Sequence, residues 1–333
     1  MNMHKIKSVE LFGGAGGLAL GLEKSGIECA AIIEIEHSAC ETLKANRPQW
    51  NVIENDIRCV NFKEYENIID LVSGGAPCQA FSYAGKKLGF GDTRGTLFSE
   101  FARCVSEIKP KIFLFENVRG LLSHDRGRTF LTIKHTFEKL GYSVQHKILN
   151  ACYYGVGQKR ERIFIIGIRN DLIGRILFEY PRPDHKCTTL REALKNCPPS
   201  VGVSFSENKR RVMELVPPGG CWIDLPEEIA KNYMGKSFFL SGGRRGIARR
   251  ISWDEPCLTL TTSPSQMQTE RCHPDETRPF TVREYARIQS FPDDWIFKGT
   301  VTEQYKQIGN AVPVEVARRV GVEIVKALEK ITD

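Results

Sequence analysis

A cysteine stands directly after an apolar run, in a setting that favours chemistry. Residues 68–73 are followed by Gly74-Gly-Ala-Pro-Cys78-Gln79, which places Cys78 in a turn-forming loop with basic residues downstream. Such surroundings lower the pKa of a thiol below its free value of about 8.5 and yield a nucleophilic thiolate. Most free cysteines are buried and inert, and we assign that role to the other ten of the eleven. Cys78 is the candidate nucleophile.

An acid and two arginines are candidates to assist it. Glu116 ends the apolar run 111–116, and a carboxyl group there is a candidate general acid or, alternatively, a cap of the next element. Arg160 and Arg162 alternate in Gln158-Lys-Arg-Glu-Arg, which places both guanidinium groups on one face of an extended chain. Such a run is usually solvated charge, but arginine is also well suited to hold a phosphate or a base oxygen.

A glycine-rich turn indicates a second ligand site. Phe12-Gly-Gly-Ala-Gly16 follows the first apolar run, and its glycines allow close approach of a ligand at the start of the next helix. The turn fits a nucleotide-like ligand of any kind, although the spacing is not the G-x-G-x-x-G of a dehydrogenase. Glu34, after the second run, can accept from two ribose hydroxyls, and Asp56 from an adenine amino group. Either acid can instead cap a helix.

The elements that carry these residues follow a regular pattern. Between residues 8 and 167, apolar β-branched or aromatic runs alternate with segments of helical period, which is typical of parallel strands joined by helices. We expect strands at 9–12, 29–35, 68–73, 111–116, 143–150 and 162–168, and helices at 18–24, 38–46, 97–108 and 129–140. The fold class is therefore α/β with a doubly wound, Rossmann-like sheet, whose ligands bind outside the carboxyl ends of the strands.

The composition changes after Arg169. A stretch rich in Pro, Gly and Arg runs to about residue 279, with strand-like pieces at 236–240 and 257–262, and helical period returns at 281–289 and 314–328. We expect a catalytic and cofactor-binding domain at 1–187, completed by 300–333 with its last helix packed back on it. The remaining parts are a smaller irregular domain at 188–280 and a connection at 281–299.

Composition limits the class of protein. The 333 residues have 41% hydrophobic content and a net charge of +7, which is typical of a globular protein and favours an anionic partner such as nucleic acid. No C-x-x-C occurs, so we expect reduced thiols and no metal site. We see no signal peptide and no apolar run long enough for a bilayer, and therefore expect a cytoplasmic protein without membrane contact.

Taken in order, these segments resemble the DNA (cytosine-5) methyltransferase family, in particular the compact bacterial enzymes of restriction–modification systems. The resemblance covers 8–169 and 278–314 and rests on six segments in series: Pro77-Cys-Gln-Ala-Phe-Ser82, Asp92-Thr-Arg-Gly-Thr-Leu-Phe98, Glu116-Asn-Val, Gln158-Lys-Arg-Glu-Arg162, Arg283-Glu-Tyr-Ala-Arg-Ile-Gln-Ser-Phe-Pro-Asp and Gln307-Ile-Gly-Asn-Ala-Val-Pro. The chain departs from the family pattern at four positions, with Glu10 for Asp, Ile35 for an aromatic residue, Asn55 for Gly and Ala76 for Pro.

The resemblance implies methyl transfer from S-adenosylmethionine to carbon 5 of cytosine, with S-adenosylhomocysteine as the other product. Cys78 would add to carbon 6, so that carbon 5 becomes nucleophilic enough to attack the sulfonium methyl group. Glu116 would protonate or hydrogen-bond ring N3, and Arg162 would hold the base carbonyl with Arg160 close by. Because a stacked base hides carbon 6, the cytosine would have to be flipped out of the duplex.

The resemblance also implies the binding residues. The cofactor would be bound by Phe12, Gly14, Gly16, Glu34, Ile35, Asp56, Ile57, Pro77, Leu97, Asn310, Ala311 and Val312. DNA would be contacted by Gln79 and Ser82 and by Lys86, Lys87 and Arg94 of a loop that closes over it. The irregular domain at 188–280 would recognise the target sequence, with Arg244, Arg245, Arg249 and Thr259 as candidates for base or phosphate contacts.

Two other functions would also fit the fold. A tRNA-modifying branch of the same family carries a Cys-Phe-Thr signature and a short variable region, neither of which occurs here. A non-catalytic protein that senses cytosine would not need Cys78, Glu116, Arg160 and Arg162 together. We therefore expect an enzyme that acts as a monomer on double-stranded DNA, with a cognate restriction endonuclease as a functional rather than a physical partner.

Overall fold

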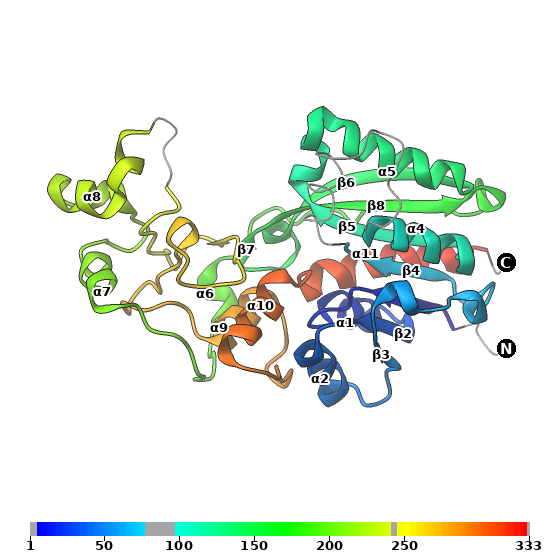
Figure 1. Ribbon diagram of the computed structural model, residues 1–333, viewed down its shortest axis with the longest axis horizontal. Coiled ribbons are helices and arrows are strands. Elements are labelled where there is room, and N and C mark those ends of the chain that lie inside the picture. Colours follow the sequence, from blue (N-terminus) through cyan, green and yellow to red (C-terminus); the bar gives the residue numbers. More distant parts are fainter. Residues whose placement is uncertain (1–4, 77–96, 241–244, 332–333) are drawn as a thin grey trace. The chain divides into compact units, whose positions relative to one another are not determined.

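The computed structural model describes residues 5–76, 97–240 and 245–331. The chain divides into two compact units (Figure 1). The sheet unit consists of Met1–Asn150, Glu161–Arg182 and Val314–Asp333, and the second unit of Ala151–Arg160 and Pro183–Pro313.

The sheet unit is built around seven strands in the order β3-β2-β1-β4-β5-β8-β6. Their bounds are β1 Lys7–Leu11, β2 Glu28–Glu34, β3 Val52–Glu54, β4 Leu71–Gly74, β5 Ile112–Val118, β6 Tyr142–Asn150 and β8 Glu161–Arg169. The chain first moves outward from β1 to β3 and then restarts on the other side of β1 with β4. The expected doubly wound α/β fold is confirmed, and its switch point lies between β1 and β4.

One strand runs against the others. β8 is antiparallel to both of its neighbours, β5 and β6, whereas we expected parallel strands throughout. The reason is the connection: only ten residues separate Asn150 from Glu161, and a parallel crossover needs a dozen or more. As a consequence, β8 begins at the edge of the sheet where the parallel strands end.

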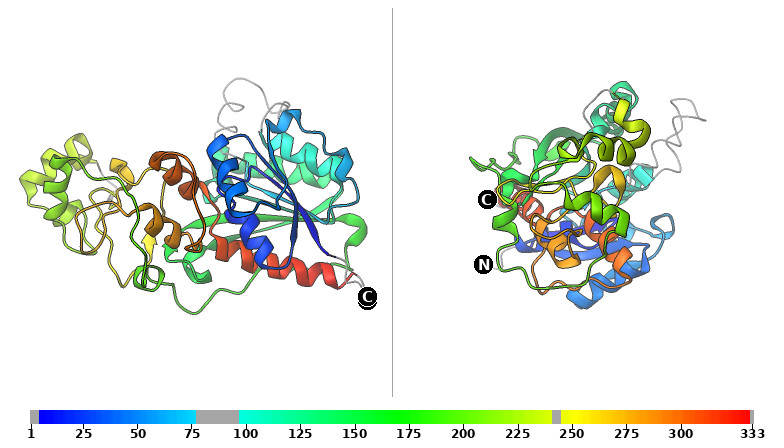
Figure 2. Two further views of the ribbon diagram at one scale, coloured as in Figure 1. Left: turned by 90° about the horizontal axis from the view of Figure 1, so that it is seen from below. Right: turned by 90° about the vertical axis from the view of Figure 1, so that its left-hand side faces the viewer.

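Helices cover both faces of this sheet (Figures 1 and 2). α4 (Leu97–Ile108) and α5 (Arg128–Lys139) lie on one face, and α1 (Gly17–Lys24) and α2 (His37–Asn46) on the other. The last helix, α11 (Val314–Glu329), packs along α1 so closely that a methyl group on Gly21 would lie 2.3 Å from the side chain of Ala317. The expectation that the last helix returns to this part of the chain is confirmed. Short 3₁₀ turns complete the unit: η1 Ile57–Cys59, η2 Lys63–Tyr65, η3 Arg119–Leu122, η4 His124–Gly127 and η6 Asn170–Leu172.

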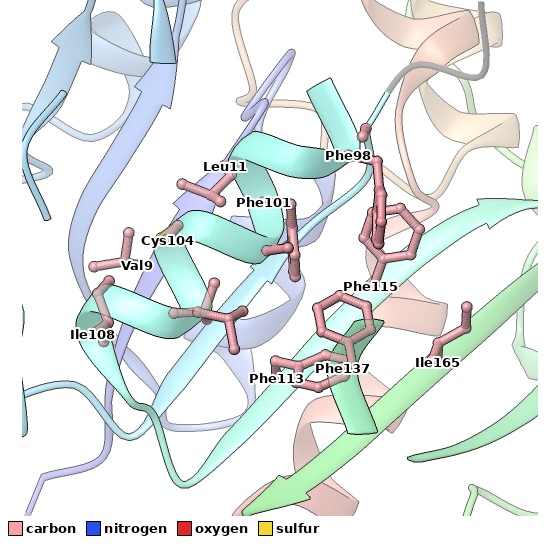
Figure 3. Packing of buried hydrophobic residues seen from close by; sticks show 14 of the residues in the cluster. Val9, Leu11, Phe98, Phe101, Cys104, Ile108, Phe113, Phe115, Phe137 and Ile165 are labelled. Atoms are coloured by element: carbon pink, nitrogen blue, oxygen red, sulfur yellow. The ribbon is translucent and has the colours of Figure 1, made fainter. Parts of the chain in front are cut away.

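An aromatic cluster joins α4 and α5 to the centre of the sheet (Figure 3). The ring of Phe101 on α4 meets Phe115 of β5 at 4.9 Å, and Phe137 of α5 lies 4.0 Å from Phe113. β8 can pass this cluster only with a glycine at 167, because a methyl group there would lie 1.9 Å from the ring of Phe113. Each such aromatic pair contributes about 0.5–1.5 kcal/mol beyond burial, so the strand that carries Glu116 is firmly held.

The second unit has little regular structure. Its elements are η5 Ala151–Tyr154, β7 Gln158–Lys159, α6 Leu190–Ala193, α7 Glu207–Glu214, η7 Trp222–Asp224, α8 Glu227–Met234, η8 Gly235–Phe239, β9 Cys257–Leu258, η9 Met267–Thr269, α9 Val282–Ile288 and α10 Val301–Asn310. β7 and β9 form a two-residue parallel pair.

Several details differ from the expectations drawn from the sequence. Residues 236–239 belong to the 3₁₀ turn η8 rather than to a strand. Of 257–262, only the first two residues pair, because no longer partner strand lies beside them. The sequence analysis missed the short strands β3 and β7 and the helices α6, α7, α8 and α10. For α10 the signal was present, since Thr300 and Glu303 form a capping box at its start.

The cysteines also differ from the expectation of reduced thiols. Cys152 and Cys187 form a disulfide, with Cα atoms 4.6 Å apart. The chain returns to η5 through backbone hydrogen bonds from Asp184 to Tyr153 and from Thr188 to Cys152, which bring the two residues together. A separation of 35 residues carries no sequence signal of pairing, so this correction required the tertiary structure.

Within the described ranges, no helix is both long and apolar enough to cross a membrane.

Candidate active site

The described site candidates of the sheet unit lie at one edge of the sheet, the edge formed by the carboxyl ends of its parallel strands. Strand register pairs Leu11 with Gly74 and Gly74 with Phe115, so the ends of β1 and β4 lie level with the last residues of β5. The glycine turn that begins at Phe12 and the loop that leads from Gly75 toward Cys78 therefore start beside Glu116. Ligands of such sheets bind at this edge, beside the switch point.

The loop after β4 is fixed against the end of β5. The Asn117 side-chain amide donates to the carbonyl of Ala76 at 2.9 Å, and both residues are buried. A methyl group on Gly75 would lie 2.8 Å from Oε2 of Glu116 and 3.0 Å from its carbonyl oxygen, so only glycine fits there. The start of the loop therefore lies directly against the Glu116 carboxyl group. Pro77, Cys78, Gln79, Ser82, Lys86, Lys87 and Arg94 lie outside the described residues.

Glu116 and Arg162 form an ion pair at this edge. Arg162 Nε lies 3.3 Å from Glu116 Oε1, and the two side chains are only 16% and 12% exposed. Arg162 reaches the carboxylate because antiparallel β8 begins here, with Arg162 opposite Val118 of β5. The reversed direction of β8 is therefore what assembles an acid and a guanidinium group beside the loop that leads to Cys78.

The glycine turn is tied to the end of β2 through Glu34. Its Oε2 accepts from the backbone N–H of Gly14 at 2.6 Å, and Oε1 accepts from the N–H groups of Ile35 and Glu36 at 2.8 Å. A carboxylate has about four acceptor positions, so one remains for a ligand hydroxyl rather than the two that we expected. Gly14 and Gly16 have φ values of 52° and 79°, which explains why glycine stands at both.

The other cofactor candidates of the sheet unit differ in what their side chains offer. Ile35 is 62% exposed and presents an apolar surface directly after β2, and Phe12 is half-buried at the end of β1. Asp56 caps η1 and pairs with Arg58, whose hydrogen bonds lower the pKa of the Asp56 carboxyl to about 2. The cap interpretation of Asp56 is thus the one that the structure displays. Ile57 is buried, and Leu97 packs partly buried against the aromatic core.

Arg160 is separated from Arg162 in spite of its position in the sequence. It precedes β8, belongs to the second unit and is 2% exposed. Its guanidinium group donates to the carbonyls of Leu260, Gly309 and Ala311 at 2.9–3.2 Å. The expectation of two guanidinium groups on one strand face is wrong, because the strand begins only at Glu161. Arg160 positions backbone within the second unit.

A buried amide network surrounds Arg160. Gln289 donates to the carbonyl of Ile308 at the end of α10 and accepts from Gln158, whose side-chain oxygen in turn accepts from the N–H of Leu260. Gln158, Gln289, Asn117 and Gly75 were not among our candidates, although all lie in or beside the motif segments that we singled out. Asn310, Ala311 and Val312 follow in the second unit directly after this network, with Asn310 exposed and the other two buried.

The DNA-contact candidates of the second unit are used in different ways. Arg245 is exposed, whereas Arg249 donates to the Gly219 carbonyl and pairs with Glu255. The Thr259 hydroxyl donates to the Lys159 carbonyl at 2.8 Å. Arg249 and Thr259 therefore have partners within the second unit, and their role as base or phosphate contacts stays a prediction. Arg244 lies outside the described residues. No cluster of three or more metal-ligating side chains occurs among the residues that the structure describes.

Comparison with known proteins places the chain in a family. The C-5 cytosine-specific DNA methylase model matches residues 6–326. The chain is 56% identical to the type II methyltransferase M.Eco47II of Escherichia coli, over 97% of this chain and 79% of that protein. It is 58% identical to the type II methyltransferase M.Sau96I of Staphylococcus aureus, over 96% of this chain and 76% of that protein.

Two solved structures share the fold. A DNA modification methyltransferase encoded within an E. coli prophage has a TM-score of 0.70 at 24% identity, and DNMT2 of Spodoptera frugiperda has 0.69 at 17%. Each comparison covers 97% of this chain and 99% of the other. The expected fold class and family are confirmed: the chain belongs to the C-5 cytosine-specific DNA methylase family and is a DNA (cytosine-5) methyltransferase of the restriction–modification type.

Proposed function

We propose that this enzyme transfers a methyl group from S-adenosylmethionine to carbon 5 of a flipped-out cytosine in a specific double-stranded DNA sequence, through a covalent bond between Cys78 and carbon 6. The proposal rests on the geometry at the carboxyl ends of β4 and β5, which we call the locked edge of the sheet unit. There, Gly75 and Asn117 fix the start of the Cys78 loop against the Glu116–Arg162 pair. An acid and a guanidinium group beside the start of the loop that leads to Cys78 match what addition to cytosine requires.

The residues at this edge fit the cofactor. Glu34 has an acceptor position left for a ribose hydroxyl, and the exposed Ile35 side chain offers an apolar surface to adenine. The N-terminus of α1 has no side-chain cap, so its N–H groups suit the methionine carboxylate. Phe12, Gly14 and Gly16 would line the turn, with Asp56, Ile57, Pro77, Leu97 and Asn310 to Val312 as further contacts. Bound S-adenosylmethionine supplies the methyl group as an electrophile, and S-adenosylhomocysteine remains.

The protein's own residues would perform the activation. The Cys78 thiolate adds to carbon 6, and the electron density that this addition moves toward N3 is stabilised there by a proton or hydrogen bond from Glu116. Arg162 holds the Glu116 carboxyl group in place and faces the base carbonyl. After methyl transfer, the carbon 5 proton leaves to solvent water, any proton at N3 returns to Glu116, and Cys78 departs as a thiolate, which restores the aromatic ring. Arg160 acts on this reaction only through the framework that it holds.

The remaining parts of the proposal concern DNA. Residues 188–280 would recognise the target sequence, 281–299 would connect the domains, and Arg245 would be a direct contact. Gln79, Ser82, Lys86, Lys87, Arg94, Arg244, Arg249 and Thr259 complete the proposed contacts. The enzyme would act as a cytoplasmic monomer that protects host DNA from a cognate endonuclease.

Methyl incorporation tests the mechanism. We expect tritium from labelled S-adenosylmethionine to enter plasmid DNA with the wild-type enzyme and not with Cys78→Ser, because a hydroxyl is a far weaker nucleophile than a thiolate at neutral pH. Bisulfite sequencing of the product identifies the methylated cytosine. Undiminished incorporation by Cys78→Ser would contradict the covalent mechanism, and incorporation at a position other than carbon 5 would contradict the proposed reaction.

A further inference from the structure

One stretch of the second unit combines positive charge with exposed aromatic surface. Residues 231–250 contain six Lys or Arg residues and no Asp or Glu. Lys231 pairs with Glu227, while Arg249 and Arg250 donate to backbone carbonyls inside the unit. Lys236 and Arg245 are exposed, and no carboxylate among the described residues pairs with them. The stretch therefore presents uncompensated positive charge to an anionic partner.

Phe239 lies in this stretch and is 77% exposed, more than any other large hydrophobic side chain among the described residues. Leu240 beside it is 53% exposed. An exposed phenylalanine ring is hydrated unfavourably, and its burial against a partner would lower the free energy. A partner with both anionic groups and flat apolar surface would cover it, and duplex DNA offers phosphates at its surface and flat base faces where a base step is opened.

The Phe239 ring packs against a series of aromatic side chains. It meets Phe238 edge-on at 5.3 Å, and Phe238 meets Trp222 in the same manner at 5.6 Å. Trp222 and Phe238 pack against the buried cluster of this unit that includes Met213 and Ile247. The backbone N–H of Trp222 donates to the carbonyl of Ile247, two residues after Arg245. The exposed ring is thus held by packed aromatic side chains, and one of them, Trp222, is also hydrogen-bonded to the segment that contains Arg245.

We propose that Phe239 is an aromatic wedge that contacts the base stack of the DNA substrate, while Lys236 and Arg245 contact its phosphates. The inference rests on the proposed function only in that the substrate is duplex DNA. Apolar side chains inserted against or between base steps are a known means of deforming DNA, and a rigid mount keeps the ring from folding back on the protein surface.

Binding measurements with three variants test this role. The probe is a fluorescein-labelled duplex that carries the site found by bisulfite sequencing, with S-adenosylhomocysteine present. We expect Phe239→Ala to raise Kd about tenfold with an unchanged salt dependence, as loss of base stacking predicts. The double variant Lys236→Ala, Arg245→Ala should instead reduce the slope of log Kd against log salt by about two. The matched control is Leu131→Ala, which truncates a 61% exposed side chain on α5 of the sheet unit and should leave Kd unchanged.

A spectroscopic signature separates stacking from a structural role. Phe239→Trp should bind DNA like the wild type, and its additional tryptophan fluorescence should be quenched when the duplex is added, beyond the change in the wild type. An unchanged Kd for Phe239→Ala would overturn the inference. So would altered sedimentation of that variant without DNA, which would identify the ring as a contact between protein copies. If the wild type does not methylate DNA, the proposed function itself fails; if it does and Phe239→Ala binds normally, only the wedge is lost.

Discussion

The two units differ in how deeply they bury arginine. In the sheet unit, Arg162 keeps part of its side chain exposed, pairs with the Glu116 side chain at the functional edge and donates to the carbonyl of Glu161. In the described part of the second unit, strand pairing is limited to the two-residue pair of β7 and β9 and a few isolated bridges, and fully buried arginines donate to backbone carbonyls. Arg160 binds three of them, and Arg250 binds those of Met213, Val216 and His273 among others.

The difference shows that charge alone does not identify a binding residue. A buried carbonyl without a partner costs about 1–3 kcal/mol, so an irregular chain must supply donors from side chains, and guanidinium is the donor with the most N–H groups. In a region with little sheet and only short helices, we therefore expect arginines first of all to donate to backbone carbonyls. Those that remain exposed, such as Arg245, are the better candidates for contact with DNA.

The largest expected effect concerns the acid of the sheet unit. Glu116→Gln should lower the rate of methyl incorporation about 100- to 10,000-fold, because the amide cannot supply a proton at N3. The melting temperature should change little, since the shape of the side chain is kept. Single-turnover incorporation and thermal unfolding measure the two quantities. A variant with near wild-type rates would show that the Glu116–Arg162 pair is only structural.

The two arginines of the Gln158-Lys-Arg-Glu-Arg segment should separate stability from activity. Arg160→Lys should lower the free energy of unfolding by about 2–4 kcal/mol, because a lysine cannot reach three carbonyls at once. Arg162→Lys is its matched control and should change stability by less than about 1 kcal/mol while it lowers the rate at least tenfold. Denaturant titrations alongside incorporation assays measure both. The comparison breaks down if Arg160→Lys unfolds like the wild type but loses activity.

A single methyl group should disturb the locked edge. Gly75→Ala would place its methyl group 2.8 Å from Oε2 of Glu116 and should displace the carboxylate, with a rate loss of about 10- to 100-fold. Gly120→Ala is the control in the same unit, since its methyl group would meet only Val118 at 3.9 Å. Equal rates for the two variants would contradict the view that Gly75 is required by its contact with Glu116.

The smallest effect concerns a carboxyl group that the sheet unit buries without an ion pair. Burial raises the pKa of Glu10 to about 8. Between about pH 4.5 and pH 8 the unfolded chain has lost this proton while the folded protein keeps it, so stability falls as pH rises. Glu10→Gln removes this dependence and should gain at least about 1 kcal/mol on the wild type between pH 5 and pH 8. Denaturant unfolding at both pH values measures it; a parallel fall in wild type and variant would assign the slope to other groups.

Much of the sheet unit could be predicted from the sequence. Six of its strands and its principal helices were expected close to their observed positions, because short apolar runs and amphipathic segments have distinct periods. The second unit was far less predictable. Its short helices and turns are determined by contacts between distant residues, such as Gln158 with Gln289 and Arg160 with Gly309.

The sequence by itself determined the family, the doubly wound fold and the types of residue available for chemistry, since motif segments and periodicity are local properties of the chain. Only the tertiary structure decided which of those residues meet. The reversed direction of β8 brought Arg162 to Glu116, while the start of that strand at Glu161 left Arg160 in the second unit. Strand direction and the satisfaction of buried carbonyls depend on partners far along the chain, and no spacing in the sequence specifies them.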